Sequence, residues 1–99
     1  IRLILLMDIR HPLQDYDQQM LNWAAQAGLP VHILLTKADK LKRGPAKSSL
    51  LAVDKRLRDM DPGYTLLSVQ VFSSLKKIGL MELEQQLNNW LVSDQLQTD

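Results

Sequence analysis

Two kinds of apolar block alternate along this 99-residue chain, and this alternation constrains its fold more than any other feature. All four glycines and all four prolines lie between the blocks, where turns are expected. Residues 1–7, 31–35 and 65–72 form short apolar or β-branched runs, which predict strands. Residues 13–27, 46–60 and 80–91 repeat apolar positions every three or four residues, which predicts helices. The order β-α-β-α-β-α therefore predicts an α/β fold: a parallel sheet in a three-layer arrangement, with helices on both faces.

Each predicted helix carries one apolar face, which we expect to pack on the sheet. Because Tyr16 and Trp23 belong to the face of the first helix, and Trp90 to that of the third, we expect all three aromatic rings in the core. The third strand alternates Ser68 and Gln70 with valines, which indicates an edge strand. The first strand is expected at the opposite edge.

Composition excludes several classes of protein. The chain has no cysteine, so it has no disulfide and no cysteine nucleophile, which suits the reducing cytoplasm, its expected location. No apolar run reaches the ~18 residues of a membrane span, so no membrane association is expected. The only histidines, His11 and His32, lack metal-ligand spacing; His11 is interpreted as a turn residue and His32 as a residue at the edge of the core.

The chain begins with Ile1 inside an apolar run, and its most apolar strand would lie at an exposed edge of the sheet. We therefore expect it to be part of a longer protein, with residues 1–92 forming a partial domain and residues 93–99 a polar tail that frays.

The net charge of +1 hides an uneven distribution. The stretch from Lys37 to Arg58 carries a net charge of +6, whereas the remainder carries −5. Two interpretations stay open: a solvated helix face with a flexible loop around Lys40–Lys47, or an electrostatic contact with RNA phosphates.

Polar side chains follow all three predicted strands, at the sheet edge where parallel α/β proteins bind ligands. Asp39 follows the second strand, and a carboxylate there can accept hydrogen bonds from the ring N–H and the exocyclic amine of guanine, a pair that adenine lacks. Lys37 can lay its aliphatic stem along the base. Ser73 and Ser74 follow the third strand, where backbone N–H groups can meet the guanine O6.

Simpler interpretations exist for the same residues. Asp39 could cap the N-terminus of the next helix, and Ser73 or Ser74 could cap the last one. Asp8 and Arg10, after the first strand, are interpreted as a local turn or ion pair. A phosphotransfer role for Asp8 would need a second carboxylate beside it, but its neighbours are Met7 and Ile9.

Two of these strand ends resemble motifs of GTPases. Thr36-Lys37-Ala38-Asp39 is similar to the fourth GTPase motif, and Ser73-Ser74-Leu75 with Gly79 is similar to the fifth. Together with Met7-Asp8-Ile9-Arg10-His11-Pro12, Asp17-Gln18-Gln19-Met20 and the run from Phe72 to Lys77, they resemble the EngB (YihA/YsxC) family of ribosome-biogenesis GTPases over essentially all 99 residues.

The resemblance implies the C-terminal half of a Ras-like P-loop GTPase domain, with further strands before Ile1. It implies GTP or GDP as ligand and Mg²⁺ in the complete protein, with the Mg²⁺ ligands lying outside this chain. The residues implied to contact the guanine nucleotide are Thr36, Lys37, Asp39, Phe72, Ser73 and Ser74. In this pattern Thr36 tethers the loop in place of the asparagine of the wider superfamily, and the Ser74 N–H faces O6. The implied role is large-subunit assembly and thereby cell division, with ribosomal RNA or the large ribosomal subunit contacting Lys37–Arg58.

Two GTPase motifs are missing from the chain, G-x-x-x-x-G-K-[ST] and Asp-x-x-Gly. No catalytic residue is therefore assigned, and the fragment alone is expected to be inactive in hydrolysis and to bind nucleotide weakly. The alternative is a stand-alone basic βαβ module that binds RNA, not DNA, without nucleotide chemistry.

Overall fold

The computed structural model describes residues 2–60 and 66–97 and confirms the α/β architecture. Its elements, in chain order, are β1 (Leu3–Asp8), α1 (Asp15–Ala27), β2 (Val31–Thr36), η1 (Ala38–Lys40, a 3₁₀ turn), α2 (Arg43–Met60), β3 (Leu67–Val71) and α3 (Leu80–Gln97). The three strands are parallel in the order β1-β2-β3, so β1 and β3 are the edges, as predicted.

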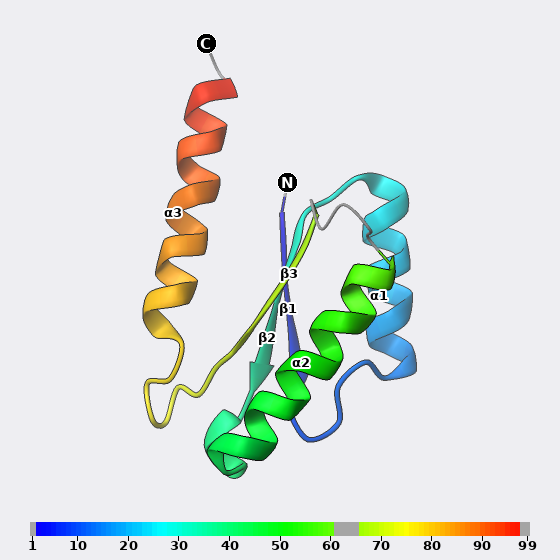
Figure 1. Ribbon diagram of the computed structural model, residues 1–99. Coiled ribbons are helices and arrows are strands. Elements are labelled where there is room, and N and C mark those ends of the chain that lie inside the picture. The colour runs from blue at the N-terminus through cyan, green and yellow to red at the C-terminus, as the bar shows by residue number, and fades with distance from the viewer. Residues whose placement is uncertain (1, 61–65, 98–99) are drawn as a thin grey trace.

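The helices cover the two faces of the sheet unequally. Helices α1 and α2 lie on one face and α3 lies on the other (Figure 1). The buried core is concentrated between the sheet and the first two helices, where Ile33 and Leu35 of β2 meet Leu21 of α1 and Val53 and Leu57 of α2. Because burying one such side chain stabilises a fold by about 1.5–3 kcal/mol, this layer holds the domain together.

Helix α1 packs through a different face from the one the apolar pattern predicts. Leu21 and Ala24 are buried, whereas Tyr16 is 66% and Trp23 is 54% exposed, so the prediction that these two aromatics lie in the core is wrong. The buried face also contains Asp17, whose carboxylate accepts a hydrogen bond of 3.1 Å from the backbone N–H of Gln14 at the helix start. This capping bond gives the buried carboxylate a partner on the face that packs.

The sheet face under α3 contains a polar hydrogen-bonded group beside the buried Leu34. His32 hydrogen-bonds through Nδ1 to Ser68 Oγ and through Nε2 to Gln70 Oε1, both at 2.7 Å. The ring of Trp90 meets His32 edge-on with centroids 6.3 Å apart, and the Arg2 guanidinium lies 5.7 Å from the Trp90 ring centre. Trp90 is only half-buried, so its assignment to the core is wrong, whereas the interpretation of His32 as a buried core-edge residue is confirmed.

The ends of two helices also differ from the sequence prediction. Helix α3 continues through residues 93–97, where the sequence predicts a fraying tail. Helix α2 begins at Arg43 and η1 precedes it, so the interpretation of Lys40–Lys47 as a flexible loop is wrong. Within the described part of the chain, no helix combines the length and hydropathy needed to cross a membrane.

Gly79 joins the loop after β3 to the start of α3 in a conformation that excludes other residues. Its φ is +79°, and a Cβ built there would overlap the carbonyl oxygen of Val71 and lie 2.7 Å from Gln70 Nε2. Gln70 itself donates hydrogen bonds to the carbonyls of Gly79 at 2.7 Å and Val71 at 3.2 Å. The buried amide therefore fixes the position of the loop from inside the sheet.

Substitution of Gly79 by alanine should lower the free energy of unfolding by ~1–3 kcal/mol, because the left-handed conformation and the overlap with Val71 both oppose a side chain. Gly44→Ala is the matched control: no atom lies within 4 Å of its added Cβ, and its φ is not positive. Urea denaturation of both variants compares them. Equal stability of the two would contradict the role assigned to Gly79.

Candidate functional site

The six residues singled out by the sequence line one cleft at the carboxyl edge of the sheet. The cleft has a volume of about 450 Å³, within the range typical of small-molecule sites. One wall comes from the loop after β2 and the other from the loop after β3. Its lining includes Thr36, Lys37, Asp39, Phe72, Ser73 and Ser74, together with Leu6, Arg10, Lys40 and Leu75.

The loop after β2 turns sharply at Lys37. This residue adopts a left-handed conformation (φ 59°, ψ 34°), which is unfavourable for a residue with a side chain. Two backbone hydrogen bonds hold it there: Lys40 N–H donates to the Lys37 carbonyl at 2.9 Å, and Ala38 N–H donates to the Phe72 carbonyl at 3.1 Å. The second bond also joins the two walls of the cleft.

Asp39 is held by a side chain from the opposite wall. The hydroxyl of Ser73 donates a hydrogen bond of 2.6 Å to Asp39 Oδ1. This bond is the main reason that the pKa of the Asp39 carboxyl lies below its usual range, so the group is ionised at neutral pH. Asp39 lies inside η1, whose N-cap is Lys37, and no side chain caps that turn, so the helix-cap interpretation of Asp39 is wrong.

Ser73 is buried and closes the loop that follows β3. Its Oγ accepts a hydrogen bond of 3.1 Å from the Lys76 N–H, and its backbone exchanges two hydrogen bonds with Ile78, at 3.0 and 2.9 Å. These contacts are local to the loop and α3 begins at Leu80, so the alternative interpretation of Ser73 as a cap of α3 is wrong. Ser74 is exposed at the tip of the same loop.

Thr36 and Phe72 connect the cleft to the sheet beneath it. The Thr36 hydroxyl donates a hydrogen bond of 3.2 Å to the carbonyl of Met7. Thr36 therefore ties the start of the loop after β2 to the neighbouring strand β1. The Phe72 N–H donates to the carbonyl of Leu35 at 2.9 Å and extends the pairing of β2 with β3.

Arg10 also lines the cleft, although the sequence indicates no role for it there. Arg10 binds Asp8 through Nη2 at 2.8 Å and Nε at 3.0 Å, which confirms the local ion pair. The hydrogen bonds from Arg10 hold the pKa of Asp8 well below its usual range, and Lys37 Nζ lies 3.8 Å from the same carboxylate. The signal in the sequence was the position of Arg10 just after the first strand.

Comparison with known proteins gives relatives that share most of this chain. No family model matches it. The "Probable GTP-binding protein EngB" of Azoarcus sp. (strain BH72) is 52% identical over 92 residues, which cover 93% of this chain and 43% of the relative. The proteins of the same name from Acinetobacter baumannii and Aromatoleum aromaticum are 59% and 47% identical, over 82% and 92% of this chain and 37% and 41% of their own lengths.

This chain is an EngB homologue. The resemblance inferred from three strand ends is thereby confirmed, and the fold corresponds to part of a P-loop GTPase domain. The chain spans about two fifths of the length of the EngB proteins that it matches.

Ser73→Ala should raise the pKa of Asp39 toward its ordinary value of 3.8, because the hydrogen bond from Ser73 is the largest cause of its lowering. The carboxylate would then gain its proton at a higher pH when the solution is acidified. The carboxyl ¹³C resonance of Asp39, followed by NMR from neutral to acid pH, measures the shift. Ser74→Ala, on the exposed tip of the same loop, is the control and should leave the titration in place; an unshifted midpoint in Ser73→Ala would refute the assignment.

Proposed function

We propose that this chain supplies the guanine-recognition part of an EngB-type GTP-binding protein. The observation that carries the proposal is the convergence of Thr36, Lys37 and Asp39 with Phe72, Ser73 and Ser74 on one cleft. Residues more than thirty positions apart in the chain meet there, and the carboxylate among them is ionised and held in place. The name of the EngB relatives supports a guanine nucleotide, GTP or GDP, as the ligand.

In this proposal Asp39 selects the base. Its carboxylate accepts hydrogen bonds from the ring N–H and the exocyclic amine of guanine, and adenine offers no such pair. The aliphatic stem of Lys37 covers one face of the ring, and the backbone N–H of Ser74 meets O6. Thr36, Phe72 and Ser73 hold the two loops in register around the base through the hydrogen bonds described above.

Phosphate binding and hydrolysis are assigned to residues outside this chain. The chain has neither G-x-x-x-x-G-K-[ST] nor Asp-x-x-Gly, the motifs that cradle phosphates and hold Mg²⁺ in P-loop GTPases. We propose that Mg²⁺ binding and GTP hydrolysis belong to the complete protein and that the 99-residue chain by itself has no hydrolytic activity.

The sharpest test is Asp39→Asn in the gene product that carries this chain. The amide presents a donor to the ring edge, so GDP affinity should fall roughly 10–100-fold, the effect of losing one charge-assisted hydrogen bond. Affinity for xanthosine diphosphate, whose base has a carbonyl in place of the amine, should rise. Isothermal titration calorimetry with GDP, xanthosine diphosphate and ADP gives the three affinities.

Asp59→Asn is the matched control, because Asp59 is an exposed aspartate at the end of α2 and outside the cleft. It should keep the wild-type preference for GDP. Unchanged GDP affinity in Asp39→Asn would show that the base is bound elsewhere.

The basic stretch supports a second part of the proposal, a contact with ribosomal RNA. The six basic residues from Lys42 to Arg58 are all exposed, and of these only Arg58 forms an ion pair, with Asp54, within the described part of the chain. Unpaired cations on one helix suit phosphate groups. On the resemblance to the EngB family we also propose that the protein acts in the cytoplasm on the large ribosomal subunit during its assembly, and that cell division depends on it through this step.

A double reversal, Lys55→Glu with Arg56→Glu, should weaken co-sedimentation with large ribosomal subunits and flatten its dependence on salt concentration. Lys77→Glu is the control: it reverses a charge on the loop after β3, outside the basic stretch, and should leave co-sedimentation unchanged. RNA binding by the 99-residue chain without any nucleotide affinity in the gene product would favour the stand-alone RNA module instead.

A further inference from the structure

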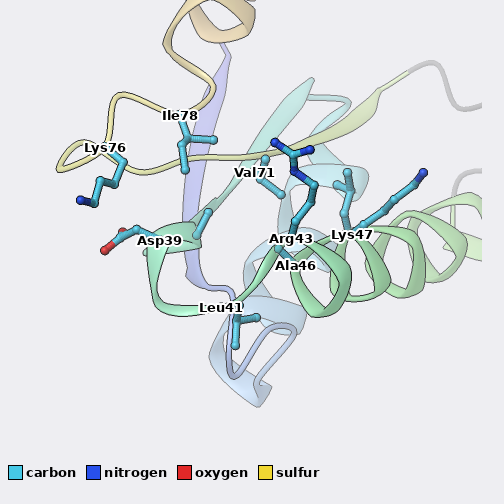
Figure 2. Close-up of a pocket in the computed structure, with 10 residues that line it drawn as sticks. Asp39, Leu41, Arg43, Ala46, Lys47, Val71, Lys76 and Ile78 are labelled. Atoms are coloured by element: carbon cyan, nitrogen blue, oxygen red, sulfur yellow. The ribbon is translucent and has the colours of Figure 1, made fainter.

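A second cavity lies on the other side of Asp39 from the cleft. Its volume is about 480 Å³, and its walls come from η1, α2, β3 and the loop after β3 (Figure 2). Asp39 is the one described residue that lines both spaces. The proposed guanine site does not use this cavity, so its chemistry needs a separate explanation.

The floor of the cavity is aliphatic. Leu41, Leu50, Val71 and Ile78 line it, and no aromatic side chain does. Leu41, Leu50 and Val71 are only partly buried and pack against the hydrophobic core. Binding of a carbon chain in such a cavity is favourable, because it removes the apolar surface of both the lining and the chain from water.

One end of the cavity carries positive charge that the chain does not neutralise. Arg43 and Lys47 lie one turn apart on α2 and project from the same side of the helix (Figure 2). Among the described residues no carboxylate pairs with either, and the first turn of α2 contains no acidic residue. At the opposite end of the cavity lie Asp39 and Lys76, so the anionic Asp39 is set apart from Arg43 and Lys47 (Figure 2).

We propose that this cavity is a binding site for an aliphatic carboxylate. The carboxylate lies against Arg43 and Lys47, and the carbon chain lies across Leu50 and Val71 toward Ile78. Guanidinium and ammonium groups form their strongest hydrogen bonds with such an anion, and the floor accommodates the rest of the molecule. Inside this cavity RNA fits less well than along the other basic residues of α2, since its phosphates would leave the aliphatic floor in water and its bases would find no aromatic ring to stack on.

Two sources share this chemistry: a free aliphatic acid, and the C-terminal leucine or isoleucine of a partner protein. The proposal does not depend on guanine recognition, because Arg43, Lys47, Leu50 and Val71 do not line the cleft. Loss of either site therefore leaves the other testable.

The test uses the gene product that carries this chain, with isotope-labelled leucine and valine methyl groups. Octanoate and acetyl-leucyl-leucine, which has a free carboxylate, are titrated while the methyl resonances of Leu50 and Val71 are followed by NMR. We expect saturable shifts from at least one of them. Octylamine and acetyl-leucyl-leucinamide, which keep the carbon chains but lack the anion, should produce none at the same concentrations.

Removing the two cations together, as Arg43→Gln with Lys47→Gln, should raise the midpoint of the titration roughly tenfold or more, the loss expected for charge-assisted hydrogen bonds. Lys55→Gln with Arg56→Gln removes the same charge from other positions of α2 and should leave the midpoint unchanged. Saturation by octanoate alone identifies a free acid, and saturation by the peptide alone identifies a partner's C-terminus.

Three results would overturn the proposal: equal shifts from octylamine and octanoate, a midpoint insensitive to the loss of Arg43 and Lys47, or saturation of the same methyl groups by single-stranded oligouridylate at concentrations where neither acid binds.

Discussion

The central strand β2 is hydrogen-bonded to β1 on one edge and to β3 on the other, and every functional feature of the chain depends on this parallel pairing. The register aligns Asp8 of β1 with Thr36 of β2, and Leu35 with Val71 of β3. The three strands therefore end at nearly the same level, and the loops that leave them meet at one edge. Burial of β2 from Val31 to Leu35 makes this pairing the least exposed part of the molecule.

At that edge, a few hydrogen bonds hold the loops after β2 and β3 in place as the two walls of the cleft. Ser73 binds the Asp39 carboxylate across the cleft, and Ala38 N–H binds the Phe72 carbonyl beside it. Farther back, the buried amide of Gln70 holds the carbonyl of Gly79 and so fixes where the second loop returns to α3. The Ser73–Asp39 and Ala38–Phe72 bonds join the ends of two different strands, so the cleft keeps its shape only while the sheet holds its register.

Asp39 occupies an unusual position because it lines both spaces beside it. On one side the cleft gathers polar groups suited to a base, and on the other the cavity combines an aliphatic floor with the cations of Arg43 and Lys47. The two spaces differ in chemistry because α2 contributes only to the second: Arg43, Ala46, Lys47 and Leu50 line the cavity, and no residue of α2 lines the cleft. The cleft therefore suits a planar polar ring, and the cavity suits a flexible anion.

The sequence alone determined the order of strands and helices, the parallel sheet, its edges and the candidate cleft residues, because apolar periodicity and strand-end motifs are local patterns. It could not decide which face of α1 packs, because apolar residues occur on more than one side of the helix: at about 100° per residue, Trp23 lies about 160° from the buried Leu21. The sequence also could not show that His32 hydrogen-bonds to Ser68 and Gln70 on the sheet face that α3 covers. Nor could it show that the Asp39 carboxylate accepts a hydrogen bond from Ser73 instead of capping a helix. The hydrogen bonds of His32 and Asp39 join groups more than thirty residues apart, and the packed face of α1 depends on the sheet that it meets, so only the tertiary structure decides these contacts.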